Sequence, residues 1–141
     1  MTPAMGNANL PLIRVVAAVI AREGKYLITQ RRGTAVLPGL WEFPGGKVEP
    51  GESDAVALAR EIQERISVDV IVGERMALRQ HTYVGYRVEL NLYRTSIVVG
   101  QEPSKRRVAD IRWVRSEDFE NYPFPAADQA TTDLLLGINR A

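Results

Sequence analysis

Two glutamates near the middle of the chain, Glu61 and Glu64, are three positions apart. If this segment is helical, that spacing places both carboxylates on the same side of the helix as neighbours. Two like charges held so close repel each other, and a divalent cation such as Mg²⁺ or Mn²⁺ relieves the repulsion through hard oxygen ligands. An acidic pair on a helix is also a common solvated surface, so the pair alone does not establish a metal site.

The residues before this pair make the pattern more specific. Gly45 and Gly46 follow Pro44 and are expected to form a tight turn, where the missing side chains let the backbone approach a ligand. Glu52 and Arg60 stand in register with the later acids, so residues 46–64 read G-x5-E-x7-R-E-U-x-E, where U is aliphatic. This combination indicates a built site far more strongly than two glutamates do.

A helix must position the acids, and the sequence predicts one. Ser53 can cap free backbone amides, and the stretch from there to Ile66 contains no Gly or Pro. On a helical projection, one apolar stripe is expected to face a sheet: Ala55, Leu58, Ala59, Ile62 and Ile66. The neighbouring face is expected to carry Asp54, Ala57, Glu61, Glu64 and Arg65.

Runs of β-branched and apolar residues predict the strands around this helix. Strands are expected at residues 13–20, 26–31, 40–43, 68–72, 76–83, 86–98 and 111–114. Turns are expected at residues 22–25 and near Gly85, loops at 33–39 and 102–110, and a second helix at 128–136. This mixed order predicts an α+β fold or a three-layer sandwich.

Composition limits the class of protein. The chain has 141 residues, is 45% hydrophobic and 25% charged, and has a net charge of +1, as expected of one soluble globular domain. That charge creates no field that favours nucleic acid or a membrane, and the longest apolar run, residues 15–20, is too short to cross a bilayer. Without cysteine, disulfides and thiol chemistry are excluded, and a cytoplasmic location is expected.

Residues 1–10 are expected to form a flexible polar lead, because they have neither the basic start nor the apolar stretch of a signal peptide. Residues 11–141 are then expected to form a single domain.

The pattern in residues 46–64 resembles the Nudix box, the signature of a family that uses divalent metal to hydrolyse nucleoside diphosphates linked to another group. The resemblance implies the Nudix fold, a mixed β-sheet sandwiched between helices. It implies that the Gly46 carbonyl, Glu61 and Glu64 bind Mg²⁺ or Mn²⁺, or that a glutamate activates water. It also implies that Glu52 and Arg60 form a structural pair that braces the loop against the helix.

Residues 40–47, LWEFPGGK, resemble the MutT subgroup, which removes pyrophosphate from nucleoside triphosphates. In that subgroup the residue matching Arg31 contacts the phosphate or sugar of the nucleotide, and Lys47 belongs to the same substrate-binding motif. Residues 125–128 resemble the segment that reads the base edge, which implies this role for Asp128. Asp128 is equally suited to cap the last helix, and the two roles are compatible.

Arg65 departs from the Nudix box, which has a glutamate metal ligand at this position. Two unit charges about 4 Å apart interact with about 4 kcal/mol at the dielectric of a protein surface, so a guanidinium here repels a metal ion. Alternatively, Arg65 pairs with Glu61 one turn back, or holds a substrate phosphate. Ser67 replaces a glycine of the box, at a modest cost for a left-handed helix end.

Arg107 is a second departure, because MutT-like relatives often have a glutamate six residues before the tryptophan of the last strand, here Trp113. Glu102 and Asp110 are substitutes from the same loop, although neither has the matching position. The basic run Lys105-Arg106-Arg107 is either a solvated loop or a phosphate-binding one, since arginine forks fit phosphate oxygens.

These features predict a Mg²⁺-dependent pyrophosphohydrolase that converts nucleoside triphosphates to monophosphate and pyrophosphate. One alternative is removal of pyrophosphate from triphosphorylated RNA 5′ ends, with residues 105–107 holding the extra phosphates. Another is a nucleotide-binding Nudix domain with impaired catalysis, which Arg65 and Arg107 favour. A nucleotide is the expected ligand and no membrane is involved, while the base and the choice between monomer and homodimer stay open.

Overall fold

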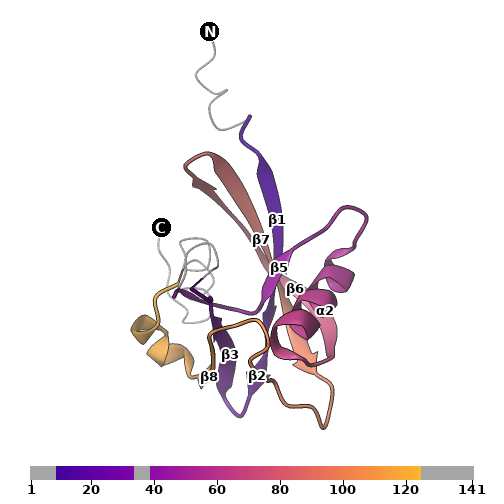
Figure 1. The fold of residues 1–141 in the computed structure, drawn as a ribbon, viewed down its shortest axis with the longest axis vertical. Coiled ribbons are helices and arrows are strands. Elements are labelled where there is room, and N and C mark those ends of the chain that lie inside the picture. The colour runs from indigo at the N-terminus through magenta and orange to yellow at the C-terminus, as the bar shows by residue number, and fades with distance from the viewer. Residues whose placement is uncertain (1–8, 34–38, 125–141) are drawn as a thin grey trace.

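The fold is α+β, as predicted, and the part of the chain that the structure describes forms two sheets (Figure 1). The computed structural model describes residues 9–33 and 39–124. In the first sheet the strand order is β5 (Gly45–Lys47), β1 (Leu12–Val19), β7 (Tyr86–Ile97) and β6 (Val70–Tyr83). β1 runs parallel to β7, and the other pairs are antiparallel, so this sheet is mixed.

The second sheet contains β2 (Ala21–Arg22), β3 (Lys25–Gln30) and β4 (Trp41–Glu42), with β8 (Asp110–Val114) paired to β3. A 3₁₀ helix, η1 (Ser116–Asn121), follows β8. Within the described residues no helix combines the length and apolar character that crossing a membrane requires. The helix expected at 128–136 and most of the loop at 33–39 lie outside the described residues.

The segment with Gly45 and Gly46 is not the predicted turn but the strand β5. It pairs with β1 in antiparallel register, with Gly45 opposite Ala17 and Gly46 opposite Val16. A Cβ atom on Gly45 would lie 1.9 Å from the carbonyl oxygen of Val16. Glycine is therefore required here for close approach to a neighbouring strand rather than for a left-handed turn.

The predicted helix is confirmed as α2 (Asp54–Ile66). The hydroxyl of Ser53 caps it by accepting a 3.2 Å hydrogen bond from the amide of Val56. Ser67 ends it in a left-handed conformation, with φ 58° and ψ 38°, and its amide bonds to the carbonyl of Gln63. Serine thus adopts the conformation for which glycine is usual.

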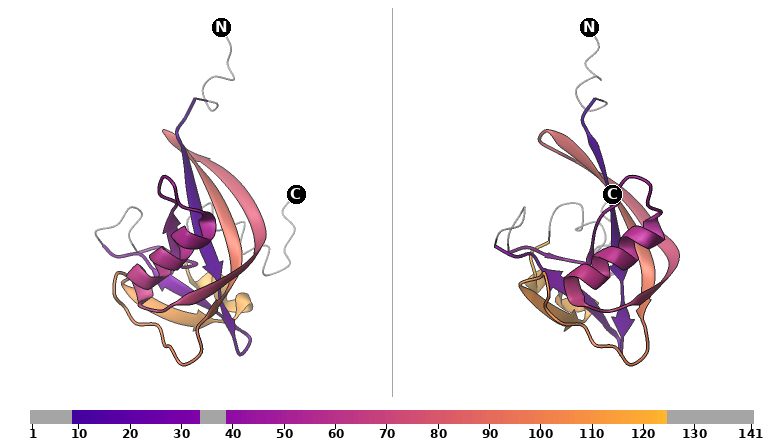
Figure 2. Two further views of the ribbon diagram at one scale, coloured as in Figure 1. Left: turned by 90° about the vertical axis from the view of Figure 1, so that its right-hand side faces the viewer. Right: turned by 45° about the vertical axis from the view of Figure 1, so that its right-hand side comes forward.

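The buried face of α2 differs from the predicted stripe. Ala55 is exposed and Ala59 is half-buried, whereas the buried residues are Ala57, Leu58, Glu61, Ile62 and Ile66. These follow the i, i+3, i+4 spacing, but the polar type of Glu61 concealed the pattern. The helix therefore points one of the two acids into the protein, and Figure 2 shows α2 lying against the sheet that contains β1.

β1 is covered on both faces. Val16 and Ala18 join the core beneath α2, whereas Ala17 and Val19 join a second core with Phe43 and other aromatic residues. Trp41 packs there edge-to-face on Tyr122, at 5.1 Å between ring centroids. A strand buried on both faces reads as a continuous apolar run, which is why the sequence predicts it well.

The strands predicted at 68–72 and 76–83 are one strand, β6, whose register shifts between Val72 and Ala77. These irregularities let a 14-residue strand bend along its partner β7. Gly85, at φ +88°, makes the predicted turn between them.

Candidate active site

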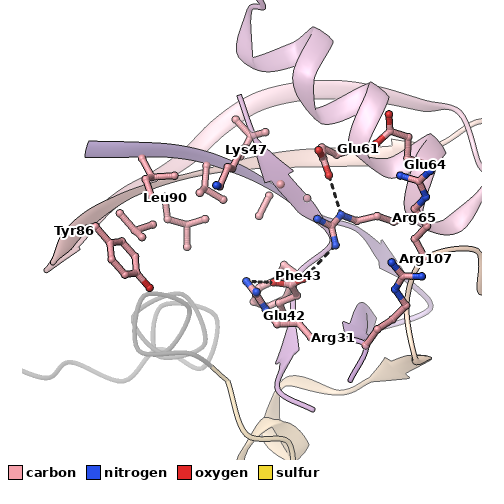
Figure 3. Close-up of a pocket in the computed structure, with 18 of the residues that line it drawn as sticks. Arg31, Glu42, Phe43, Lys47, Glu61, Glu64, Arg65, Tyr86, Leu90 and Arg107 are labelled. Carbon is pink, nitrogen blue, oxygen red and sulfur yellow. Dashed lines mark hydrogen bonds and ion pairs between the residues drawn. The ribbon is translucent and has the colours of Figure 1, made fainter. Parts of the chain in front are cut away.

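A cavity of about 630 Å³ opens between α2, the first sheet and the segment that carries residues 31–32 and 42–43. Its apolar lining comes mainly from β1, β6 and β7: Ile13, Val15, Val16, Ala17, Tyr83, Tyr86, Val88 and Leu90. Its charged lining consists of Arg31, Arg32, Glu42, Lys47, Glu61, Glu64, Arg65 and Arg107. Figure 3 shows Tyr86 and Leu90 on one side and the charges of α2 on the other. The cavity is therefore divided into an apolar half and a charged half.

Glu61 is held against the backbone of β5. A Cβ atom on Gly46 would lie 2.2 Å from Oε2 of Glu61, so the carboxylate occupies the space that any larger residue would fill. The glycine of the motif is thus matched to the glutamate of the helix. This places a backbone segment and a carboxylate, both sources of hard oxygen ligands, side by side.

Both oxygens of Glu61 accept hydrogen bonds from arginines. Nη1 of Arg60 donates to Oε1 at 2.8 Å, and Nε of Arg65 donates to Oε2, also at 2.8 Å. Glu64 is less engaged, because its nearest cation is Nη1 of Arg60 at 3.6 Å and 40% of its side chain is exposed. The pairing of Arg65 with Glu61, one of three alternatives from the sequence, is therefore the arrangement in this structure.

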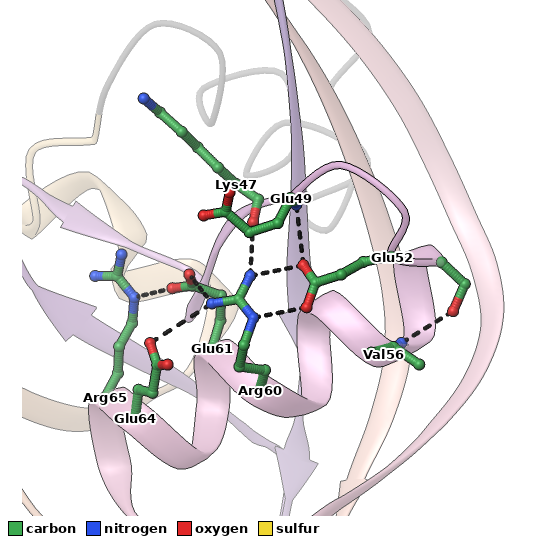
Figure 4. A network of polar contacts seen from close by, with 9 residues as sticks. Lys47, Glu49, Glu52, Val56, Arg60, Glu61, Glu64 and Arg65 are labelled. Carbon is green, nitrogen blue, oxygen red and sulfur yellow. Dashed lines mark hydrogen bonds and ion pairs between the residues drawn. The ribbon is translucent and has the colours of Figure 1, made fainter.

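Arg60 and Glu52 form a bidentate pair that joins the loop to α2 (Figure 4). Nε and Nη2 of Arg60 donate to the two carboxylate oxygens at 2.7 and 2.8 Å, and Nη2 also donates to the carbonyl of Lys47 at 3.1 Å. The hydrogen bonds from Arg60 to Glu52, with one from the amide of Glu49, lower the pKa of Glu52 to about 2. Arg60 thus connects the loop, the end of β5 and Glu61.

Glu42 is a site residue that the sequence analysis missed. It is 8% exposed, and its carboxylate lies 2.9 Å from Nη2 of Arg31 and 3.9 Å from Nη1 of Arg65. Burial raises the pKa of Glu42, and the two arginines oppose that rise. A single acid inside the apolar run Leu40 to Phe43 was the available signal, because an acid in a buried strand needs a partner.

The loop at residues 102–110 is hydrogen-bonded to the C-terminal end of α2. The amides of Arg106 and Arg107 both donate to the carbonyl of Arg65, at 3.1 and 3.0 Å, and the amide of Ser104 donates to the carbonyl of Ile66. Such bonds satisfy carbonyls that a helix end leaves free. They bring Arg107, whose side chain lines the cavity, next to Arg65.

The two acids considered as substitutes in this loop do not line the cavity. Glu102 pairs with Arg22 at 3.0 Å, and Asp110 pairs with Arg112 and Lys105. The backbone amide of Ile111 is the main cause that lowers the pKa of Asp110. Of the basic run, only Arg107 lines the cavity, while Arg106 is exposed.

The oxygen atoms at this site are of the type that binds a divalent cation, but Arg65 competes for one of them. Gly46, Glu61 and Glu64 line the same cavity and offer a carbonyl and two carboxylates, the ligands that Mg²⁺ and Mn²⁺ prefer. In residues 9–33 and 39–124, however, no three acidic or histidine side chains are grouped as a metal site. Because Arg65 holds one oxygen of Glu61, a cation that binds there must compete with this guanidinium.

The structure brings most of the predicted substrate-binding residues into one cavity: Arg31, Lys47, Arg65 and Arg107. The expected role of Asp128 falls outside the described residues.

Comparison with known proteins finds a matching family model and several similar chains. Residues 15–134 match the family model described as NUDIX domain. The CTP pyrophosphohydrolase of Escherichia coli K12 is 35% identical over 132 residues, which cover 94% of this chain and 97% of that protein. A putative 8-oxo-dGTP diphosphatase 2 of Mycobacterium tuberculosis is 35% identical over 134 residues, 89% of each chain. The solution structure of the E. coli ORF135 protein superimposes with a TM-score of 0.77 at 33% identity, over 92% of each chain.

Proposed function

This chain belongs to the Nudix family, and on that premise we propose that it hydrolyses nucleoside triphosphates to nucleoside monophosphate and pyrophosphate. The division of the cavity is the observation that carries this proposal. The apolar half, which includes Tyr83 and Tyr86, suits a flat base, and the charged half suits a polyphosphate. That half has five cationic side chains against three carboxylates, so its balance favours an anionic ligand.

The roles of the acidic residues follow from their surroundings. Gly46, Glu61 and Glu64 would hold Mg²⁺ or Mn²⁺, which supplies charge neutralisation at the phosphates and a water of lowered pKa. Glu64 is the more exposed acid and is not bound tightly to a cation, so it is suited to accept a proton from the attacking water. Glu61 is fixed by Arg60, which Glu52 fixes in turn.

The cations would position the substrate. Arg31 is held in place by Glu42, while Lys47 and Arg107 are exposed at the rim of the same cavity. Bidentate arginine contacts with phosphate fix orientation as well as charge, which supports an in-line attack. Base selection by Asp128, a cytoplasmic location and the choice between monomer and homodimer remain predictions.

A second function, nucleotide binding with little turnover, is favoured by the hydrogen bond from Arg65 to Glu61. This contact occupies an oxygen that the metal would need. Catalysis then depends on how readily Arg65 leaves Glu61.

Turnover of a panel of nucleoside triphosphates with Mg²⁺ tests the proposal. CTP and 8-oxo-dGTP come first, because two similar proteins carry those activities in their names, and a triphosphorylated RNA oligonucleotide tests the RNA alternative. Release of pyrophosphate with the matching monophosphate supports the proposal. Release of orthophosphate alone contradicts it, and tight binding without any product favours the binding module.

A further inference from the structure

We propose that Arg65 is an exchangeable counter-ion of Glu61. In the free protein its guanidinium neutralises this carboxylate. When nucleotide binds, the polyphosphate replaces Glu61 as the partner of the guanidinium, so that nucleotide binds before the divalent cation. This inference rests on the proposed function, because it concerns the same cavity.

The contacts of Arg65 leave it able to exchange. Its Nε bonds to Oε2 of Glu61 at 2.8 Å, but Nη1 lies 3.9 Å from Glu42, beyond hydrogen-bond distance. The side chain is 31% exposed and lines the cavity. A guanidinium has five N–H donors in a planar fork, and among the described contacts only one makes a hydrogen bond. The remaining donors are those that a phosphate group would engage.

Glu61 remains paired if Arg65 leaves. Oε1 keeps its 2.8 Å hydrogen bond from Arg60, which the bidentate contact with Glu52 holds in place. A buried carboxylate that loses its only cation is strongly destabilised, and the second arginine removes that penalty. The exchange therefore releases one oxygen without leaving an uncompensated charge.

The oxygen released is the one beside β5. Oε2 accepts from Arg65, and it is also the atom that a Cβ on Gly46 would meet at 2.2 Å. The Gly46 backbone, whose carbonyl is an expected metal ligand, thus lies beside Oε2. Departure of Arg65 opens that oxygen, and its continued presence blocks it.

Arg107 supplies a second donor for the same phosphate chain. Its backbone amide bonds to the carbonyl of Arg65, and its exposed side chain lines the cavity with no carboxylate partner among the described residues. Because its position is tied to the end of α2, it stays near Arg65. The two arginines form a clamp for phosphate from different elements.

Coupling between two ligands is reciprocal. If a phosphate that removes Arg65 raises the affinity for metal, then bound metal must raise the affinity for that phosphate by the same factor. Two consequences follow. Nucleotide binds without any divalent cation, and the protein alone binds a divalent cation weakly.

Calorimetry with the α,β-methylene analogue of CTP in EDTA tests the first consequence. We expect binding to the unmodified protein, weakened about tenfold or more by Arg65→Gln or Arg107→Ala, since one charge-assisted contact is lost. Arg106→Ala is the matched control from the same loop and should change affinity less than about twofold, because its side chain lies outside the cavity. Circular dichroism and thermal unfolding verify that each variant is folded.

Mn²⁺ titration followed by electron paramagnetic resonance, without nucleotide, tests the second consequence. Mn²⁺ should bind the unmodified protein weakly and bind Arg65→Gln and Arg65→Glu about tenfold or more tightly. Analogue binding that requires Mg²⁺, or Mn²⁺ affinity that both substitutions leave unchanged, overturns the exchange. If pyrophosphate is still released in that case, the proposed function survives; if the exchange is observed without turnover, the proposed function fails alone.

Discussion

The backbone of Gly46 lies directly against the carboxylate of Glu61, at a distance that leaves no room for a Cβ atom. Strand β5 and helix α2 therefore constrain each other at one glycine. Gly45 is constrained differently, because its Cβ would meet the backbone of β1. Gly45 is therefore required for the pairing of β5 with β1, and Gly46 is required for the position of Glu61.

Gly46→Ala should inactivate the protein without unfolding it. The added methyl group must displace Glu61, which Arg60 and Arg65 hold on both oxygens, and such overpacking costs about 1–3 kcal/mol. We expect a lower melting temperature and a turnover at least about 100-fold lower, measured as pyrophosphate release. Gly33→Ala is the control, since among the described residues no atom beyond its chain neighbours lies within 4 Å of that Cβ. Equal activity of the two variants would contradict the close approach.

Glu64→Gln should preserve the fold and remove most of the activity. The side chain is 40% exposed and, among the described residues, its one charged partner is Arg60 at 3.6 Å, so stability should change little. Loss of a metal ligand or general base reduces turnover by about 100-fold or more. Steady-state kinetics at saturating Mg²⁺ measure this, with Glu74→Gln, an exposed glutamate of β6, as control. A near-normal rate would refute the assignment of Glu64.

The fold was predictable where one segment carries its own signal. The helix α2 was predictable from its capping residue Ser53. The strand β1, buried on both faces, was predictable from its continuous apolar run. β5 did not, because two glycines in a row look like a turn until the neighbouring backbone is known. Its role depends on contacts with Val16 and Glu61, which are distant in sequence.

The site was predictable in its motif and less so in its charges. The spacing of Gly46, Glu61 and Glu64 resembles the Nudix box, and this resemblance implies nucleotide chemistry; family membership is confirmed. Glu42 was missed because a buried acid is recognised by its partners, and Arg31 and Arg65 come from other elements. Spacing alone could not choose among the alternatives for Arg65.

Glu52→Gln should lower activity more than stability. It breaks the bidentate pair with Arg60, which also holds Glu61 and the carbonyl of Lys47. Loss of such a supporting contact typically costs 10–100-fold in metal affinity or activity, so turnover should fall by about that factor. Glu49→Gln is the matched control, because its side chain is exposed and only its backbone amide and carbonyl join the network. A variant with normal kinetics and a large loss of stability would make the pair purely structural.

Asp54 and Arg14 should make stability depend on acid pH. Arg14 donates to both oxygens of Asp54 and joins β1 to the first turn of α2, and Tyr93 donates to the same carboxylate. The hydrogen bonds from Arg14 lower the pKa of Asp54 in the folded protein. Because the folded pKa lies below the unfolded value of about 3.9, the unfolded chain binds more protons between the two. The stabilisation is therefore complete above the unfolded pKa and is lost as pH falls through the folded pKa.

Urea unfolding of the unmodified protein and of Asp54→Asn at pH 7 and at pH 2–3 measures this contribution. We expect the variant to be less stable by about 1–2 kcal/mol at pH 7, a modest value because 40% of Arg14 is exposed and solvent screens the pair. The difference should shrink at low pH, because the unfolded chain then binds a proton at Asp54 that folding must release. Glu102→Gln, from the exposed pair with Arg22, should show almost no difference at either pH. A difference between Asp54→Asn and the unmodified protein that stays constant with pH would mean that the side chain stabilises the helix by packing or capping, and not through its charge.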